Sequence, residues 1–211
     1  MTQEDLNKQN WDKIYSQPWD KLPWSASIKQ EFEKQYLDKY ITEPNQDILE
    51  YGCGTGFVAD YLATKGHNVL ATEYSKVAVD IIKSQNPPFE IMETSRPADV
   101  RNRSFDAITS FAVLHHQNPE TQKMFLLDFA KILKPKGQII ITGWDKDDEF
   151  WTAATPISTQ GRFSINGLEK EVPKLGLKII NSEIFAFKNP LAPFEKDYLF
   201  RCYTMCERGA K

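Results

Sequence analysis

Apolar runs alternate with helical patterns along residues 46–145 of this chain. Five short runs have the length and composition of buried strands, at residues 47–51, 68–73, 89–93, 105–113 and 138–144. Between them, apolar residues recur at helical spacing in 55–65, 77–85 and 119–133. Such an alternation of strand and helix is typical of βαβ units and predicts a parallel sheet.

Local signals mark the ends of these helices. Gly66 ends the first one, whereas Asn118, Pro119 and Glu120 supply an N-cap, a proline at the first helical position and an acid in the first turn. The sequence KPKG at 134–137 ends that helix. The nearly continuous β-branched run that follows predicts a strand covered on both faces.

The last third of the chain predicts a helix over residues 164–172, ended near Gly176, and then two strands at 177–187 and 198–205. These two strands are expected to form an antiparallel hairpin at the edge of the sheet. The predicted fold is therefore α/β, with a seven-stranded, mostly parallel sheet and helices on both faces.

An aromatic arm precedes the sheet, at residues 1–27. It carries Trp11, Tyr15, Trp19 and Trp24 among aspartates and prolines, and a helical pattern follows from residue 28 to residue 40. The remaining tryptophans, Trp144 and Trp151, lie at and after the fifth predicted strand. Both segments can cover the carboxyl edge of the sheet, so the arm is expected to act as a lid, although packing explains each single ring equally well.

Composition limits the classes of protein that fit. A chain of 211 residues with 41% apolar residues is expected to form one domain, with the arm at 1–27, the core at 28–145 and residues 146–211 on the acceptor side. A net charge of −3 and a pI near 5.7, with no block of basic residues, argue against nucleic acid. The absence of a long apolar stretch or signal sequence predicts a cytoplasmic protein without membrane association, as a monomer or weak homodimer. Its three cysteines, Cys53, Cys202 and Cys206, have neither disulfide nor zinc spacing, so no metal is expected.

The most informative stretch is ILEYGCGTGF at positions 48–57, in which a strand is followed by three alternating glycines and a helix. Such a loop lets the backbone approach a nucleotide-type cofactor. Gly52, Gly54 and Gly56 do not have the spacing of a dinucleotide fingerprint, because Phe57 stands at its third glycine position. Glu50 further disfavours a pyrophosphate and favours a ligand that carries positive charge.

This loop resembles the first motif of the class I S-adenosylmethionine-dependent methyltransferases, whose fold is Rossmann-like. The resemblance covers roughly residues 45–145 and implies S-adenosylmethionine as the cofactor. It places Gly52, Cys53, Gly54 and Gly56 around the methionine part, with Glu50 near the ammonium.

The same resemblance assigns the ends of the later strands. Glu73 would accept hydrogen bonds from both ribose hydroxyls, and either Glu93 or Asp99 would accept one from the adenine amino group. The further implied cofactor-binding residues are Tyr74, Thr94, Ser110, Phe111 and Trp24.

His115 and His116 end the fourth predicted strand, near the expected position of the methyl group. Adjacent residues of a strand point in opposite directions, so at most one of them should face the site. One could act as a catalytic base, whereas a histidine with backbone partners is the simpler interpretation. Methyl transfer needs a base only if the acceptor starts protonated.

The opening Trp11-Asp12-Lys13-Ile14-Tyr15, with Pro23-Trp24, resembles the start of small-molecule methyltransferases of the thiopurine and tellurite-resistance type. Some protein lysine methyltransferases begin similarly. A small-molecule acceptor is therefore expected, with a protein (lysine or N-terminal) methyltransferase and a non-catalytic S-adenosylmethionine-binding module as the alternatives.

Overall fold

The computed structural model describes residues 3–22, 27–147, 163–188 and 197–207. Seven strands form one sheet in the order β3-β2-β1-β4-β5-β7-β6. They are β1 (Asp47–Tyr51), β2 (Asn68–Glu73), β3 (Glu90–Glu93), β4 (Phe105–Phe111), β5 (Leu133–Trp144), β6 (Leu177–Lys188) and β7 (Asp197–Glu207). The first five pair in parallel, whereas β7 runs antiparallel to both β5 and β6. The predicted α/β class and C-terminal hairpin are confirmed.

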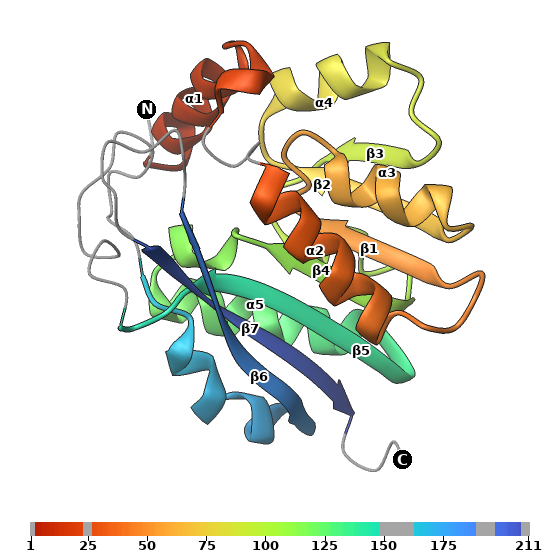
Figure 1. Cartoon of the computed structure of the whole chain (residues 1–211), viewed down its shortest axis with the longest axis vertical. Helices are drawn as coiled ribbons and strands as arrows, with labels where there is room; N and C mark the ends of the chain where they lie inside the picture. Colours follow the sequence, from red (N-terminus) through yellow and green to blue (C-terminus); the bar gives the residue numbers. More distant parts are fainter. Residues whose placement is uncertain (1–2, 23–26, 148–162, 189–196, 208–211) are drawn as a thin grey trace.

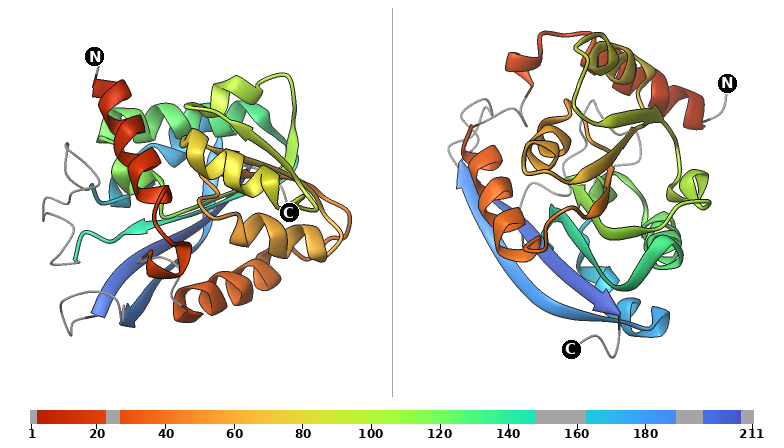
Figure 2. Two further views of the ribbon diagram at one scale, coloured as in Figure 1. Left: turned by 90° about the horizontal axis from the view of Figure 1, so that it is seen from above. Right: turned by 90° about the vertical axis from the view of Figure 1, so that its right-hand side faces the viewer.

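Helices cover both faces of this sheet (Figures 1 and 2). On one face α2 (Ser27–Tyr40), α3 (Phe57–Thr64) and α4 (Lys76–Ser84) bury Leu37, Leu62 and Ile82 in a common cluster. On the other face α5 (Pro119–Ile132) buries Leu126 and Phe129 against the same strands. The central strands are therefore buried from both sides, as their continuous apolar sequences predicted.

The predicted N-cap of α5 is confirmed, since Asn118 Oδ1 accepts a hydrogen bond from Thr121 N at 2.9 Å. Ser75 caps α4 in the same way, accepting from Ala78 N at 3.2 Å. Each cap satisfies one backbone donor that the first helical turn leaves without a partner.

Three predicted boundaries were wrong. The fourth strand ends at Phe111 rather than at 113, because Ala112 has a left-handed φ of 60° and a 3-10 helix, η4 (Leu114–His116), follows. The helix predicted at 164–172 is instead two 3-10 helices, η5 (Asn166–Lys170) and η6 (Val172–Leu175); Pro173, which lacks an N–H, lies in the second. The fifth strand begins earlier, at Leu133, which pairs with Phe105 before an irregularity in the ladder.

The N-terminal arm contains a helix, α1 (Gln3–Tyr15), and a short 3-10 turn, η1 (Trp19–Lys21). Figure 1 shows α1 beside α4, away from the C-terminus. Trp24 and Trp151 lie outside the described residues. Among those described, no helix is both long and apolar enough to cross a membrane.

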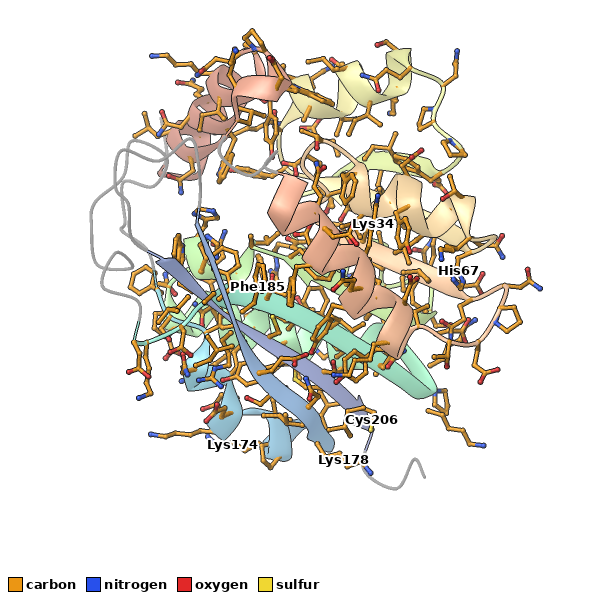
Figure 3. All side chains as sticks on the ribbon, viewed as in Figure 1. Lys34, His67, Lys174, Lys178, Phe185 and Cys206 are labelled. Carbon is orange, nitrogen blue, oxygen red and sulfur yellow. The ribbon has the colours of Figure 1, made fainter. Side chains whose placement is uncertain are left out.

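The C-terminal hairpin, which pairs with β5 through β7, also packs against α2. Figure 3 labels Phe185 on β6, whose ring stacks on that of Phe32 with centroids 3.7 Å apart. Tyr36 and Thr204 join their hydroxyls across 2.9 Å. Lys34, also labelled, places its ammonium 5.2 Å from the centre of the Phe57 ring, linking α2 to α3. This packing leaves the carboxyl edge of the parallel strands to α1 and the loops.

Candidate functional site

The glycine-rich loop turns sharply after β1. Gly52 and Gly56 have φ values of 75° and 80°, which favour glycine. A Cβ built at Gly52 would lie 2.4 Å from a methyl carbon of Val113, in the segment after β4. The backbone nitrogens of Gly52 and Cys53 both donate to Thr72 O at 2.9 Å. The loop is therefore held between β2 and the end of β4, where only a residue without a side chain fits.

Glu50 lies beneath this loop and is only 2% exposed. Its carboxylate accepts a hydrogen bond from the Thr109 hydroxyl of β4. On the same strand, Ser110 donates to Tyr51 O at 3.1 Å, and Phe111 is buried in the core. These hydrogen bonds join the ends of β1 and β4 next to the glycine loop.

Glu73 connects the glycine loop to α4. Its Oε2 accepts from Gly54 N at 2.9 Å, and its Oε1 accepts from Tyr74 N at 2.8 Å and Ser75 N at 3.0 Å. Burial is the largest influence on the pKa of Glu73 and raises it; the three backbone hydrogen bonds lower it in part, and the charge of Asp12 raises it further. A buried carboxylate at the end of β2 thus organises three backbone donors.

The two candidate acids at and after the end of β3 have different partners. Glu93 forms an ion pair with Lys8 of α1, and its side chain is 37% exposed. Asp99 instead accepts hydrogen bonds from the Thr94 hydroxyl and, at 3.0 Å, from Arg96 N. Thr94 is buried, and its N–H donates to Glu73 O at 2.9 Å. Of the two acids, Asp99 is therefore the one joined to the buried part of the site.

The two histidines lie in the 3-10 helix η4, not at the end of a strand. Strand alternation therefore does not apply to them, and the prediction that they end the fourth strand was wrong. Their rings are neighbours, with centroids 4.1 Å apart. His115 is 3% exposed, and its ring lies 5.6 Å from that of Trp144. His116 instead meets the ring of Trp11 at 5.0 Å. One histidine faces the core and the other faces α1.

Sequence reasoning did not assign Asp12, which lies on α1. Its Oδ1 accepts from the Ser75 hydroxyl at 2.6 Å and from Val77 N at 3.3 Å, at the start of α4. Tyr15, one helical turn later, is 4% exposed; burial above all, then Glu73 and Cys53, raises the pKa of its hydroxyl. The Trp-Asp-x-x-Tyr pattern was the available signal, and its residues bring α1 to the glycine loop.

A second unassigned group follows β5. Asp145 is fully buried and accepts hydrogen bonds from Arg201 Nε at 2.7 Å, Asn166 Nδ2 at 3.1 Å and Asp147 N at 2.9 Å. Burial alone would raise the pKa of Asp145, but these donors together hold it below its ordinary value. The ion pair with Arg201 fixes the chain where β5 ends.

The three cysteines are buried, and Cys202 and Cys206 lie in β7. Burial, and then the charges of Glu73 and Glu50, raise the pKa of the Cys53 thiol. Cys53 therefore contributes its backbone to the loop, not a thiolate. In the described part of the chain, no three His, Cys, Asp or Glu side chains form a group suited to a metal ion.

Comparisons with known proteins agree with this geometry. A family model described as a methyltransferase domain matches residues 25–180. A probable S-adenosylmethionine-dependent methyltransferase of Mycobacterium tuberculosis is 30% identical over 98 residues, which are 46% of this chain and 35% of that protein. A ubiquinone biosynthesis O-methyltransferase of Dechloromonas aromatica is 24% identical over 131 residues, 56% of this chain and 53% of that protein. The alignments thus span about half or less of these relatives.

The fold is also similar to a solved structure, the magnesium protoporphyrin IX methyltransferase of Synechocystis PCC 6803 with bound S-adenosylmethionine. The TM-score is 0.70 over 98% of both chains, at 15% identity. The family match over residues 25–180 and this shared fold show that the chain belongs to the methyltransferase-domain family, within the class I S-adenosylmethionine-dependent methyltransferases.

Proposed function

We propose that this protein binds S-adenosylmethionine and transfers its methyl group to a small-molecule acceptor. The observation that carries the proposal is the joining of the glycine loop to Glu73 at the carboxyl ends of β1 and β2, where doubly wound sheets bind their ligands. The names of the relatives support the same chemistry, and those with a named substrate act on small molecules.

The residues of the site fit this cofactor. Glu73 is a buried carboxylate whose Oε2 accepts one hydrogen bond, so it has capacity for another from a ribose hydroxyl. The backbone of Gly52, Cys53, Gly54 and Gly56 would surround the methionine part. The neutral Cys53 thiol adds no charge there.

The remaining cofactor contacts follow from the strand ends. Glu50 would orient the ammonium from below the loop, and Tyr74 would flank the ribose. At the adenine we favour Asp99 with Thr94 over Glu93, because Glu93 is engaged by Lys8 at the surface. Ser110 and Phe111 would support the site from the end of β4, and Trp24 would contact the cofactor from the arm.

The chemistry is an in-line displacement. S-adenosylmethionine supplies an electrophilic methyl group on a sulfonium. The protein would align the acceptor behind that methyl and exclude water, with α1 as the lid. If the acceptor is protonated, His116 is the better base, because His115 packs in a buried aromatic group whereas His116 faces α1.

Calorimetry tests the cofactor directly. S-adenosylmethionine and S-adenosylhomocysteine should bind, whereas NADH should not, because Phe57 occupies the third glycine position of a dinucleotide loop and Glu50 repels a pyrophosphate. An acceptor screen that measures S-adenosylhomocysteine release should then find a small molecule. Binding of NADH without binding of either methionine cofactor would overturn the proposal.

A further inference from the structure

One face of α1 contacts the carboxyl edge of the sheet from Lys8 to the end of the helix. Lys8 pairs with Glu93 at the end of β3, and Trp11 meets His116 beyond β4. The contacting residues of α1 are Lys8, Trp11, Asp12 and Tyr15, at the i, i+3, i+4 and i+7 spacing of one helical face. The helix therefore lies across three strand ends at once.

Asp12 makes the polar contact at the centre of this face. Its Oδ1 accepts from both Ser75 Oγ and Val77 N, at 2.6 and 3.3 Å. Ser75 Oγ in turn accepts from Ala78 N at 3.2 Å, as the N-cap of α4. A carboxylate of α1 thus extends the cap of a different helix, 63 residues away along the chain. Hydrogen bonds to a charged group at a helix N-terminus are among the stronger polar contacts.

Apolar packing surrounds this contact. Tyr15, Leu22 and Ala78 are buried together, with Trp11 and Val77 partly buried beside them. The cluster partly shields the Asp12 carboxylate from water. Its hydrogen bonds are therefore stronger than those of an exposed pair, which compete with water. By contrast, both side chains of the Lys76–Asp80 pair on α4 are more than half exposed.

Ser75 connects the contact between Asp12 and α4, here called the latch, to Glu73, the carboxylate proposed to bind ribose. Its backbone N–H donates to Glu73 Oε1 at 3.0 Å while its hydroxyl donates to Asp12. Two carboxylates, one from β2 and one from α1, are therefore bound to the same residue, and the charge of Asp12 raises the pKa of Glu73. A ribose hydroxyl that donates to Glu73 Oε2 would reduce this repulsion between the carboxylates.

We propose that Asp12 is a positioning residue that fastens α1 over the cofactor through Ser75, so that lid closure and ribose binding at Glu73 are coupled. This inference rests on the proposed cofactor site. Binding of the ribose strengthens the closed lid, and by reciprocity the closed lid strengthens binding of the cofactor by the same factor.

The test uses the full chain with S-adenosylhomocysteine as the probe. Asp12→Ala removes both hydrogen bonds and should weaken binding by about tenfold. Asp12→Asn keeps the Oδ1 acceptor and should stay within about threefold of wild type. Asp80→Ala, which removes an equal charge from the exposed face of α4, should bind like wild type. Thermal melts establish that each variant is folded.

Hydrogen exchange supplies a readout that a purely stabilising contact would not change. In wild type, the probe should slow exchange of the amides of Gln3–Tyr15, and in Asp12→Ala it should not. The double variant Asp12→Ala/Glu73→Gln should lose less binding free energy for the probe than the two single variants lose in sum, because both changes act on one coupled unit.

The two proposals fail in different ways. Equal affinity and equal protection of α1 in folded Asp12→Ala and wild type would overturn the latch and leave the cofactor site standing. Full additivity with Glu73→Gln would also overturn the coupling. Failure of wild type to bind the probe would overturn the proposed function itself, and the latch with it.

Discussion

Replacing Glu73 with glutamine tests whether this carboxylate holds both the loop and the ribose. In the wild-type protein, Oε1 accepts from Tyr74 N and Ser75 N, whereas Oε2 accepts from Gly54 N. Glutamine can keep its oxygen on the α4 side. Its amide nitrogen would then face Gly54 N, donor against donor.

The magnitude follows from this geometry. One buried N–H loses its acceptor, which costs about 1–3 kcal/mol, and removing a buried charge beside Asp12 offsets part of this loss. The net destabilisation should be about 1–2 kcal/mol, a fall of roughly 2–8 °C in Tm for a chain of this size. Loss of one charge-assisted bond to ribose should weaken cofactor binding by about 10- to 150-fold.

Thermal melting and calorimetry with S-adenosylhomocysteine measure the two effects separately. Glu90→Gln on β3 is the matched control, because the Glu90 side chain is 53% exposed and pairs with Arg103 at the surface. This control should lose less than about 1 kcal/mol and keep its affinity. A folded Glu73→Gln variant with wild-type affinity would refute the assignment of Glu73 to ribose.

Three further predictions test the loop, the histidines and the charge of Glu73. Gly52→Ala should destabilise the protein by about 2–3 kcal/mol in chemical denaturation, because of its positive φ and the 2.4 Å approach to Val113; Val113→Ala in the same chain should restore only part, since the φ strain remains. If the acceptor needs a base, His116→Ala should lower kcat by about 100-fold or more and keep the cofactor affinity, whereas His115→Ala should lower Tm instead. A wild-type kcat in both variants would exclude a base in η4. The pKa of Glu73 is higher in the folded protein than in the unfolded chain. Glu73 therefore contributes fully to the free energy of unfolding at a pH below its unfolded-state pKa, and this contribution is lost as the pH rises through its folded-state pKa. Cofactor affinity should change in the opposite sense. As the pH is lowered, the affinity should begin to fall while the pH is still above 4.5, because Glu73 takes up a proton; a Kd that does not change with pH in this range would contradict this.

The sequence by itself determined the elements with strong local signals. The strand runs, the N-cap at Asn118 and the glycine loop after β1 all correspond to the structure. These features are predictable because periodicity, capping chemistry and positive φ are properties of a few adjacent residues. The spacing of Glu73 to the glycines predicted it as a ribose-binding residue, and the structure joins its carboxylate to Gly54 of the loop.

Only the tertiary structure decided how these elements meet. Asp12 and Ser75 are 63 residues apart, and no local pattern indicates that the first completes the cap of a helix begun by the second. Likewise, no local pattern indicates that Glu93 pairs with Lys8 of α1, the contact for which we propose Asp99 rather than Glu93 at the adenine. Ala112 is left-handed although alanine rarely adopts that conformation; it packs against Trp144 and Phe200, and the next residue, Val113, lies against Gly52. Contacts between distant residues depend on the complete fold, and so they required the structure.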